Sequence, residues 1–163
     1  MVLLALFALL QSCSGGYSFT GASIPPGAKT ISVATFPNFA TNVNPQLSQK
    51  LTDELMQMFS RQTSLDVMSM EGGDLHVEGE IIGYETRAAA LSSNDEVSMN
   101  RLTITIKVRF TNNIDPESNF EQQFSRYRDY AASLDFSMVE NSLVGEIVTD
   151  LCEDVFNKAV VNW

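Results

Sequence analysis

The side chains that could carry chemistry in this 163-residue chain fall into three groups: two cysteines, one histidine beside two glutamates, and a short row of basic residues. A cysteine thiol can be acylated, oxidised or used as a nucleophile, and a histidine flanked by carboxylates can bind a metal ion. Arginine and lysine can hold phosphate or carboxylate groups. What each group can do depends on the element that carries it.

Cys13 directly follows the apolar N-terminal segment of the chain. Residues 1–10 are all apolar, and only Gln11 and Ser12 separate them from the cysteine. Such a segment is too short to span a bilayer and is typical of the hydrophobic region of an export signal. A leucine three positions before the cysteine and a serine directly before it match a lipobox. The sequence therefore predicts a lipoprotein signal peptide over residues 1–12 and lipidation of Cys13.

A lipidated Cys13 would anchor the chain to a membrane without a transmembrane helix. Two acyl chains anchor stably, because each buried CH₂ group contributes about 0.8 kcal/mol. The alternative is an ordinary apolar strand or helix with a buried cysteine, but no later segment would pair with it. Because no basic residue precedes Lys29, we expect the coding sequence to start upstream of Met1. Residues 13–28 are rich in glycine and proline and predict a flexible tether.

The composition argues against several classes of function. With 10 Lys and Arg against 20 Asp and Glu, the formal charge is −10, which disfavours nucleic-acid binding through phosphate neutralisation. No phosphate-binding glycine loop and no HExxH or GxSxG pattern occurs. We therefore predict a chain that is not an enzyme, takes no cofactor and binds no nucleic acid.

Hydrophobic periodicity predicts a single α+β domain over residues 29–163. We expect four strands, at 29–36, at 65–90 with an interruption at Gly72 and Gly73, at 97–112 and at 120–130. With a helix after the first strand and another after the last, the order is β-α-β-β-β-α. The sequence predicts a two-layer sandwich, a four-stranded mixed sheet with two helices on one face.

Two amphipathic segments predict the helices. Asn44 and Pro45 suit the N-cap and first position of the earlier helix, while Ser137 and Glu140 have the spacing of a capping box that starts the later one. The apolar arc of the later helix includes Cys152, which we expect to be an inert buried thiol rather than a reactive one. Its narrow acidic stripe is expected to face solvent, with a partner as the alternative: Glu146, Asp150, Glu153 and Asp154.

Basic side chains collect on the polar face of the strand predicted at 97–112. Arg101, Lys107 and Arg109 alternate with apolar residues, so they should project together. An arginine of the next strand, Arg126 or Arg128, is expected beside them. Such a patch could bind phosphate or carboxylate groups. The alternative is cross-strand neutralisation by carboxylates of the same face: Glu78, Glu80 and Glu121.

His76, Glu78 and Glu80 also share one face, at a spacing of two residues. One histidine and two carboxylates could form a weak metal site. Alternation more simply places all three on the solvated face of the sheet, so we predict no metal site.

Several short stretches are familiar in combination. They are the glycine-aromatic run Gly16-Tyr17-Ser18-Phe19-Thr20-Gly21, Ser23-Ile24-Pro25-Pro26 through Lys29-Thr30-Ile31, Leu47-Ser48 with Leu51-Thr52, Gly79-Glu80-Ile81 with Gly83-Tyr84, Asn100-Arg101-Leu102-Thr103, and Phe120-Glu121-Gln122-Gln123-Phe124-Ser125. Together with the lipobox cysteine and the predicted element order, they resemble the LptE family of lipopolysaccharide-assembly lipoproteins, most closely its Bacteroidetes branch. The family's glycine-aromatic run usually follows the cysteine directly, whereas Ser14 and Gly15 intervene here, which lengthens the tether.

This resemblance implies a non-enzymatic role. Such a lipoprotein plugs the lumen of a large LptD-like outer-membrane β-barrel, helps it to assemble and assists delivery of lipopolysaccharide to the outer membrane. Arg101, Lys107 and Arg109 are our candidate lipopolysaccharide-binding residues, chosen for their common face rather than from a family motif. A generic scaffold or pilot of another envelope complex is the alternative. Ser14 in place of an aspartate, and no acidic run after it, predict an anchor on the periplasmic face of the outer membrane.

Overall fold

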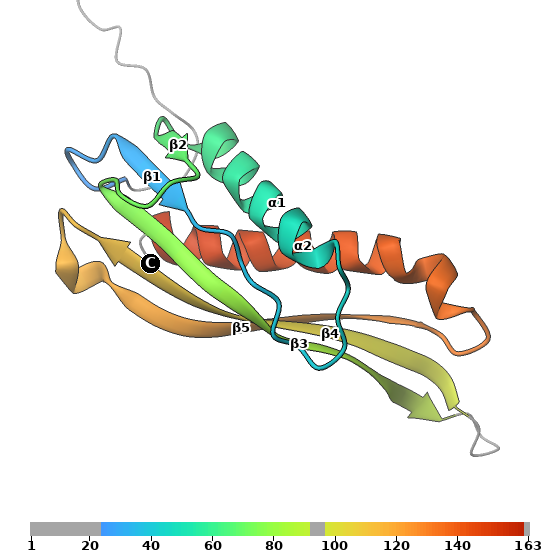
Figure 1. Cartoon of the computed structure of the whole chain (residues 1–163). Helices are drawn as coiled ribbons and strands as arrows, with labels where there is room; N and C mark the ends of the chain where they lie inside the picture. Colours follow the sequence, from blue (N-terminus) through green and yellow to red (C-terminus); the bar gives the residue numbers. More distant parts are fainter. Residues whose placement is uncertain (1–23, 92–96, 162–163) are drawn as a thin grey trace, which may run out of the picture.

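A computed structural model describes residues 24–91 and 97–161 of the chain. The predicted signal peptide, Cys13 and residues 13–23 of the predicted tether lie outside the described residues. Two helices cover one face of a twisted five-stranded sheet, and no helix of the described residues lies on the other face (Figure 1). The predicted α+β sandwich with both helices on one face is confirmed.

The sheet has the strand order β2-β1-β3-β4-β5. Its strands are β1 (Thr30–Val33), β2 (Asp66–Met68), β3 (Leu75–Leu91), β4 (Val97–Asn112) and β5 (Phe120–Ala131). β1 pairs in parallel with both β2 and β3, while β3, β4 and β5 form an antiparallel meander. The mixed sheet is therefore confirmed, but the prediction of four strands is wrong.

The additional strand comes from the segment predicted to be the beginning of β3. Residues 66–68 pair with the far side of β1, and the chain then steps across to enter β3 at Leu75. Gly72 and Gly73 make this step with φ of 109° and 125°, a backbone region that glycine enters without a steric penalty. The two glycines thus separate two strands instead of interrupting one.

The helices are α1 (Leu47–Gln62) and α2 (Phe136–Val160). The N-cap residue of α1 is Gln46, so the predicted N-cap at Asn44 and first helical position at Pro45 are wrong. Asn44 Oδ1 instead accepts from the Gln46 N–H at 3.0 Å, in the turn before the helix. Asp135 caps α2 by accepting from the Ser137 N–H at 2.9 Å, so the predicted Ser137–Glu140 capping box is wrong. Within the described ranges, neither helix is long and apolar enough to cross a membrane.

Glu140 has a different role from the predicted cap. Its Oε1 accepts from Asn44 Nδ2 at 2.8 Å and also from the Tyr84 hydroxyl. Desolvation, followed by this hydrogen bond, raises the pKa of Tyr84 above its ordinary value. One carboxylate therefore ties the turn before α1 and the middle of β3 to the first turns of α2.

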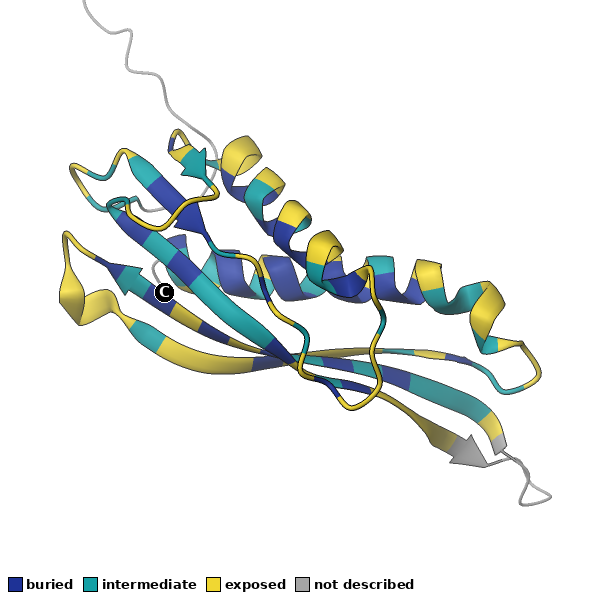
Figure 2. Ribbon diagram, in the orientation of Figure 1, coloured by how far each residue is buried: buried dark blue, intermediate teal, exposed yellow. Residues whose placement is uncertain are grey.

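The core lies between the helices and the sheet (Figure 2). The apolar faces predicted for both helices are buried, including Leu51 and Phe59 of α1 and Ile147 and Leu151 of α2. Cys152 is a free cysteine with no exposed surface, as predicted, and burial raises the pKa of its thiol. It is a packing residue, because the reactive thiolate form is disfavoured.

Asp74 fixes the start of β1 against β3. Its Oδ2 accepts from the Lys29 N–H at 2.7 Å, the Thr30 N–H at 3.0 Å and the Thr30 hydroxyl at 3.0 Å. These hydrogen bonds, the one from the Lys29 N–H foremost, hold the pKa of Asp74 below its ordinary value.

We expect Asp74→Asn to lower the urea midpoint at pH 7 and to have a much smaller effect at pH 2. A carboxyl whose pKa is lowered on folding stabilises the fold above its unfolded pKa, and this contribution disappears as the pH falls through the folded value. Urea titrations of both proteins followed by circular dichroism at the two pH values test this. An equal decrease of the urea midpoint at pH 7 and at pH 2 would contradict this prediction.

Candidate functional site

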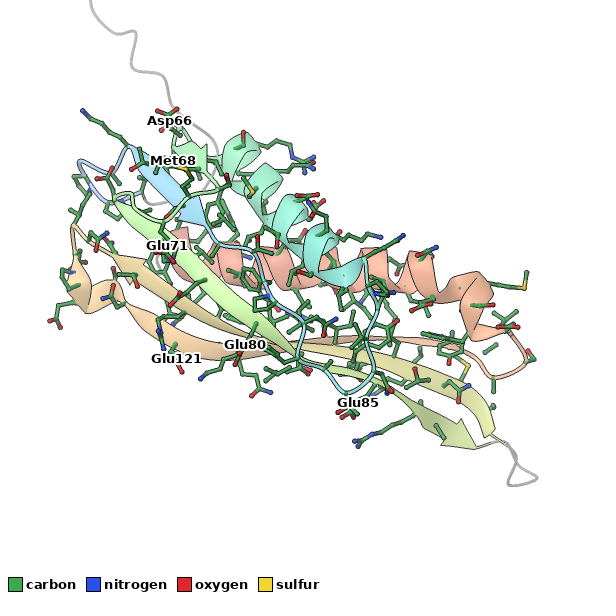
Figure 3. All side chains as sticks on the ribbon, in the orientation of Figure 1. Asp66, Met68, Glu71, Glu80, Glu85 and Glu121 are labelled. Atoms are coloured by element: carbon green, nitrogen blue, oxygen red, sulfur yellow. The ribbon has the colours of Figure 1, made fainter. Side chains whose placement is uncertain are left out.

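The face of the sheet opposite the helices carries the three basic residues chosen from the sequence. Leu102, Ile106 and Val108 of β4 are at most 1% exposed and face the helices, so the residues between them project from the opposite side. Arg101, Lys107 and Arg109 all lie on this polar face, as alternation predicted. Figure 3 shows carboxylates of β3 and β5, including Glu80 and Glu121, projecting from the same side.

Lys107 and Arg109 form one ionic cluster with two glutamates. Arg109 Nη1 lies 3.0 Å from Glu78 Oε1, and its Nη2 lies 2.9 Å from Glu121 Oε2. Lys107 Nζ is 2.5 Å from the other oxygen of Glu121. These contacts, led by the one with Lys107, hold the pKa of Glu121 below its ordinary value. We call these four residues the Arg109 cluster.

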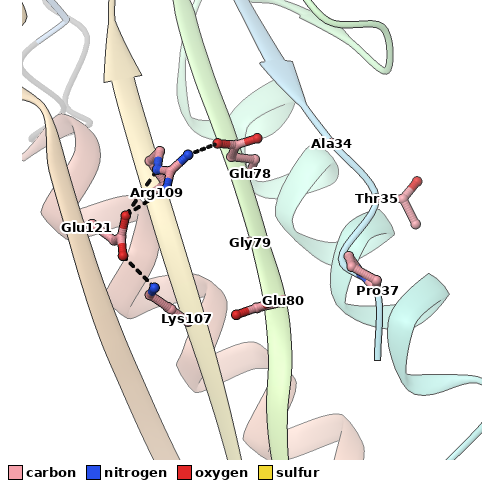
Figure 4. Close-up of a pocket in the computed structure, with 9 residues that line it drawn as sticks. All are labelled: Ala34, Thr35, Pro37, Glu78, Gly79, Glu80, Lys107, Arg109 and Glu121. Carbon is pink, nitrogen blue, oxygen red and sulfur yellow. Dashed lines mark hydrogen bonds and ion pairs between the residues drawn. The ribbon is translucent and has the colours of Figure 1, made fainter. Parts of the chain in front are cut away.

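The Arg109 cluster borders a surface hollow of about 310 Å³ (Figure 4). The hollow lies between the segment that follows β1 and the neighbouring strands, and it is lined by Ala34, Thr35, Pro37, Glu78, Gly79, Glu80, Lys107, Arg109 and Glu121. Three carboxylates and two cations meet there, so the two cations are neutralised by their own sheet. Of the carboxylates expected to do this, Glu78 and Glu121 pair with them, whereas no ion pair to Glu80 forms in the described part of the chain.

Arg101 belongs to a second cluster farther along the face. It makes a bidentate contact with Asp129, at 2.7 and 2.9 Å, and its guanidinium carbon lies 3.7 Å from the centre of the Tyr127 ring. Arg101 and Lys107 are six positions apart along β4, a distance of about 20 Å. The structure therefore brings Lys107 and Arg109 together and leaves Arg101 apart.

Arg87 of β3 is a further basic residue of this face that sequence reasoning missed. It lies directly opposite Arg101 in the β3–β4 ladder and pairs with Glu85 at 2.6 Å. Only the register across the 92–96 connection reveals this neighbour, because strand alternation alone says nothing about which residues face each other across strands.

Arg126 and Arg128 do not join the polar face, so that prediction is wrong. They pair with Ile104 and Leu102 of β4 and therefore lie on the helix side of β5. Arg126 contacts Asp154 at 2.5 Å, and Arg128 contacts Glu146 and Asp150, both at 2.8 Å. The acidic stripe of α2 was expected to face solvent, but three of its four carboxylates hold the helix to this strand.

His76 lies near both a serine and a carboxylate. Its Nδ1 is 2.7 Å from Ser32 Oγ, and its Nε2 is 3.8 Å from Glu78. Ser32 has no exposed surface, so its hydroxyl cannot reach a substrate as a nucleophile. Over the residues that the structure describes, no three histidine, cysteine or acidic side chains are arranged to hold a metal ion.

Comparisons with known proteins identify a family and a fold for this chain. A family model described as LptE, lipopolysaccharide-assembly, matches residues 28–159. Lipoprotein B from Nitrosomonas europaea superposes with a TM-score of 0.53 at 14% identity, covering 84% of this chain and 83% of that one. Rare lipoprotein B from Shewanella oneidensis gives a TM-score of 0.52 at 12% identity, covering 77% and 91%.

A minor lipoprotein from Acinetobacter baumannii gives a TM-score of 0.53 at 11% identity, with 80% of this chain and 91% of that one covered. At these identities the structural similarities establish the fold. No curated protein matches the chain in sequence.

Proposed function

Because the chain belongs to the LptE family of lipopolysaccharide-assembly proteins, we propose that it is an outer-membrane lipoprotein that plugs an LptD-like β-barrel, supports assembly of that barrel and assists delivery of lipopolysaccharide. The family match over residues 28–159 carries this proposal, since it spans both helices and all five strands apart from the last residue of α2. The role is one of binding rather than catalysis.

The lipid anchor and tether belong to the same proposal. Lipid on Cys13 would hold the chain in the periplasmic leaflet, and the residues between Cys13 and Ile24 would act as a leash. The last part of the predicted tether is not free, because Ile24 and Ala28 pack against the core and the Ala28 N–H donates to the Pro25 carbonyl at 3.0 Å. Extended chain spans at most about 3.3–3.6 Å per residue, so the domain would work within on the order of 40 Å of the membrane. That reach suits a partner embedded in the same membrane.

The Arg109 cluster is our candidate contact for the phosphate groups of lipopolysaccharide. The Arg109 guanidinium can bind phosphate in a bidentate manner, and the Lys107 ammonium adds a second positive charge next to it. Both cations are at present paired with Glu121. Binding would therefore be an exchange, in which phosphate replaces Glu121 as their partner. Arg101 offers a separate contact at the far end of the same face.

This exchange predicts that Glu121→Gln strengthens lipopolysaccharide binding. Removal of Glu121 frees Lys107 and leaves Arg109 paired with Glu78 alone. Because exposed ion pairs contribute about 0.2–1 kcal/mol, the affinity should rise by up to about fivefold. Calorimetric titration of the full chain in detergent with purified lipopolysaccharide measures it. Glu117→Gln is the matched control, since it removes an exposed carboxylate of the 3₁₀ turn (Pro116–Ser118) that pairs with neither Lys107 nor Arg109 in the described part of the chain. Unchanged or weaker binding by Glu121→Gln would refute the exchange.

A further inference from the structure

β5 forms a long, regular edge of the sheet. Among the described strands it pairs with β4 alone and forms one end of the sheet (Figure 1). Its pairing with β4 runs from Phe120 to Ala131 without a register shift, whereas the β3–β4 ladder has several. Proteins usually protect sheet edges with prolines, bulges or very short strands. The opposite edge strand, β2, has three residues, but β5 has twelve, with no proline and no bulge. Inward-pointing charges can also protect an edge, but Arg126 and Arg128 on its helix side are neutralised by carboxylates of α2.

The register shows which backbone groups of β5 point away from the sheet. The Ala132 N–H donates to the Ser98 carbonyl at 3.1 Å, which places the hydrogen-bonded pairs at the even-numbered residues of β5. The N–H and C=O groups of Glu121, Gln123 and Ser125 therefore point outward. Farther along, the Tyr127 carbonyl accepts from Arg128 Nη1 at 3.0 Å. The open part of the edge thus runs from Glu121 to Ser125.

A groove follows this open part of the edge. It has a volume of about 420 Å³ and lies between β5 and the last turns of α2, lined by Gln122, Gln123, Phe124, Ser125, Arg126, Asp154, Asn157 and Lys158. Arg126 is neutralised by Asp154. Lys158 lies over the Phe120 ring at 5.7 Å and has no carboxylate partner in the described part of the chain. Within residues 24–91 and 97–161, the groove therefore presents a row of outward-pointing backbone groups without a backbone partner, beside one positive charge without a carboxylate partner.

We propose that the open edge of β5 binds an extended segment of a partner polypeptide by strand addition, with an acidic side chain of that segment beside Lys158. Backbone hydrogen bonds along the edge would supply affinity, and the groove would give specificity by accepting an acidic side chain of the partner segment beside Lys158. A second copy of this chain fits less well, because each copy carries a formal charge of −10 and copies of like charge repel each other. This contact is additional to the lipopolysaccharide site on the polar face.

The test uses the full chain in living cells, with a photocrosslinking amino acid at Gln123. We expect an adduct with one polypeptide segment, identified by mass spectrometry and containing an aspartate or glutamate. Ser125→Pro removes an outward N–H and places a proline ring in the path of the added strand, while the ladder to β4 keeps its hydrogen bonds. It should lower the adduct yield about tenfold or more. Ser125→Ala keeps the N–H and should retain the adduct.

Lys158 provides a second pair of variants that does not alter the strand. Lys158→Glu should lower the adduct yield several-fold, and Lys158→Arg should retain it. Three outcomes would overturn the proposal. The first is that no adduct forms, and the second is that the adduct contains lipid or a second copy of this chain. The third is an adduct whose yield stays unchanged in both Ser125→Pro and Lys158→Glu. An adduct with a segment that belongs to no barrel would support strand addition while counting against the proposed function. If a barrel copurifies with the chain but the β5 edge forms no crosslink, strand addition is refuted while the proposed function stands.

Discussion

Gly79→Ala is expected to destabilise the domain by about 1–3 kcal/mol or more, because a methyl group has no space at this position. An added Cβ would lie 2.5 Å from the Lys107 carbonyl oxygen and 2.5 Å from Cε1 of Phe36. The carbonyl belongs to the β3–β4 ladder, and the Phe36 ring has no exposed surface into which it could move. Either the strands separate or the ring leaves its place in the core.

Gly145→Ala on α2 is the matched control for this substitution. The nearest atom to its added Cβ is the mobile end of the Lys50 side chain, at 3.3 Å. Alanine is also favoured over glycine inside a helix by about 1 kcal/mol. Urea unfolding followed by circular dichroism should therefore show a lower midpoint for Gly79→Ala and an equal or higher one for Gly145→Ala. Equal midpoints for wild type and Gly79→Ala would show that this packing is misjudged.

The double charge reversal Lys107→Glu with Arg109→Glu is expected to weaken lipopolysaccharide binding about tenfold or more. Charge-assisted hydrogen bonds contribute about 1.5–3 kcal/mol each, and two of the proposed phosphate contacts would be lost and replaced by repulsion. Arg101→Glu alone should have a smaller effect, since Arg101 lies in a separate cluster. Calorimetric titration in detergent measures all three proteins.

Lys50→Glu with Arg61→Glu controls for the change in net charge. Both residues are on α1, away from the polar face. Arg61 contacts Glu54 at 3.4 Å and donates to Gln57 within the same helix. This pair should leave the affinity close to that of the wild type. If it weakens binding as much as the reversal at Lys107 and Arg109, the effect is one of overall charge. If the reversal at Lys107 and Arg109 leaves lipopolysaccharide binding unchanged, the Arg109 cluster is not the contact.

Much of the fold could be predicted because it follows from local hydrophobic periodicity. Both helices bury their predicted faces, and β4 alternates as expected. The fifth strand could not be predicted in this way, since residues 66–68 are too few to establish a period and pair with β1, more than thirty positions earlier. The step across β1 depends on the backbone angles of Gly72 and Gly73, which the sequence allows but does not require.

The candidate site shows the same division between local and non-local information. Alternation placed Lys107 and Arg109 correctly on the polar face, but it could not show that Glu121 of another strand neutralises both. For Arg126 and Arg128 a usable signal existed, because they share the parity of Phe120 and Phe124, which face the helices. Their charge suggested solvent, yet long side chains on an edge strand can reach the acidic residues of α2.

Isolation of the full chain from outer membranes in mild detergent, followed by mass spectrometry of the associated proteins, tests the central claim most directly. The proposed role predicts that a large outer-membrane β-barrel copurifies in stoichiometric amount, with lipopolysaccharide bound to the complex. Recovery of the chain from intact outer membranes without any such barrel, or in a complex of other envelope proteins, would contradict it.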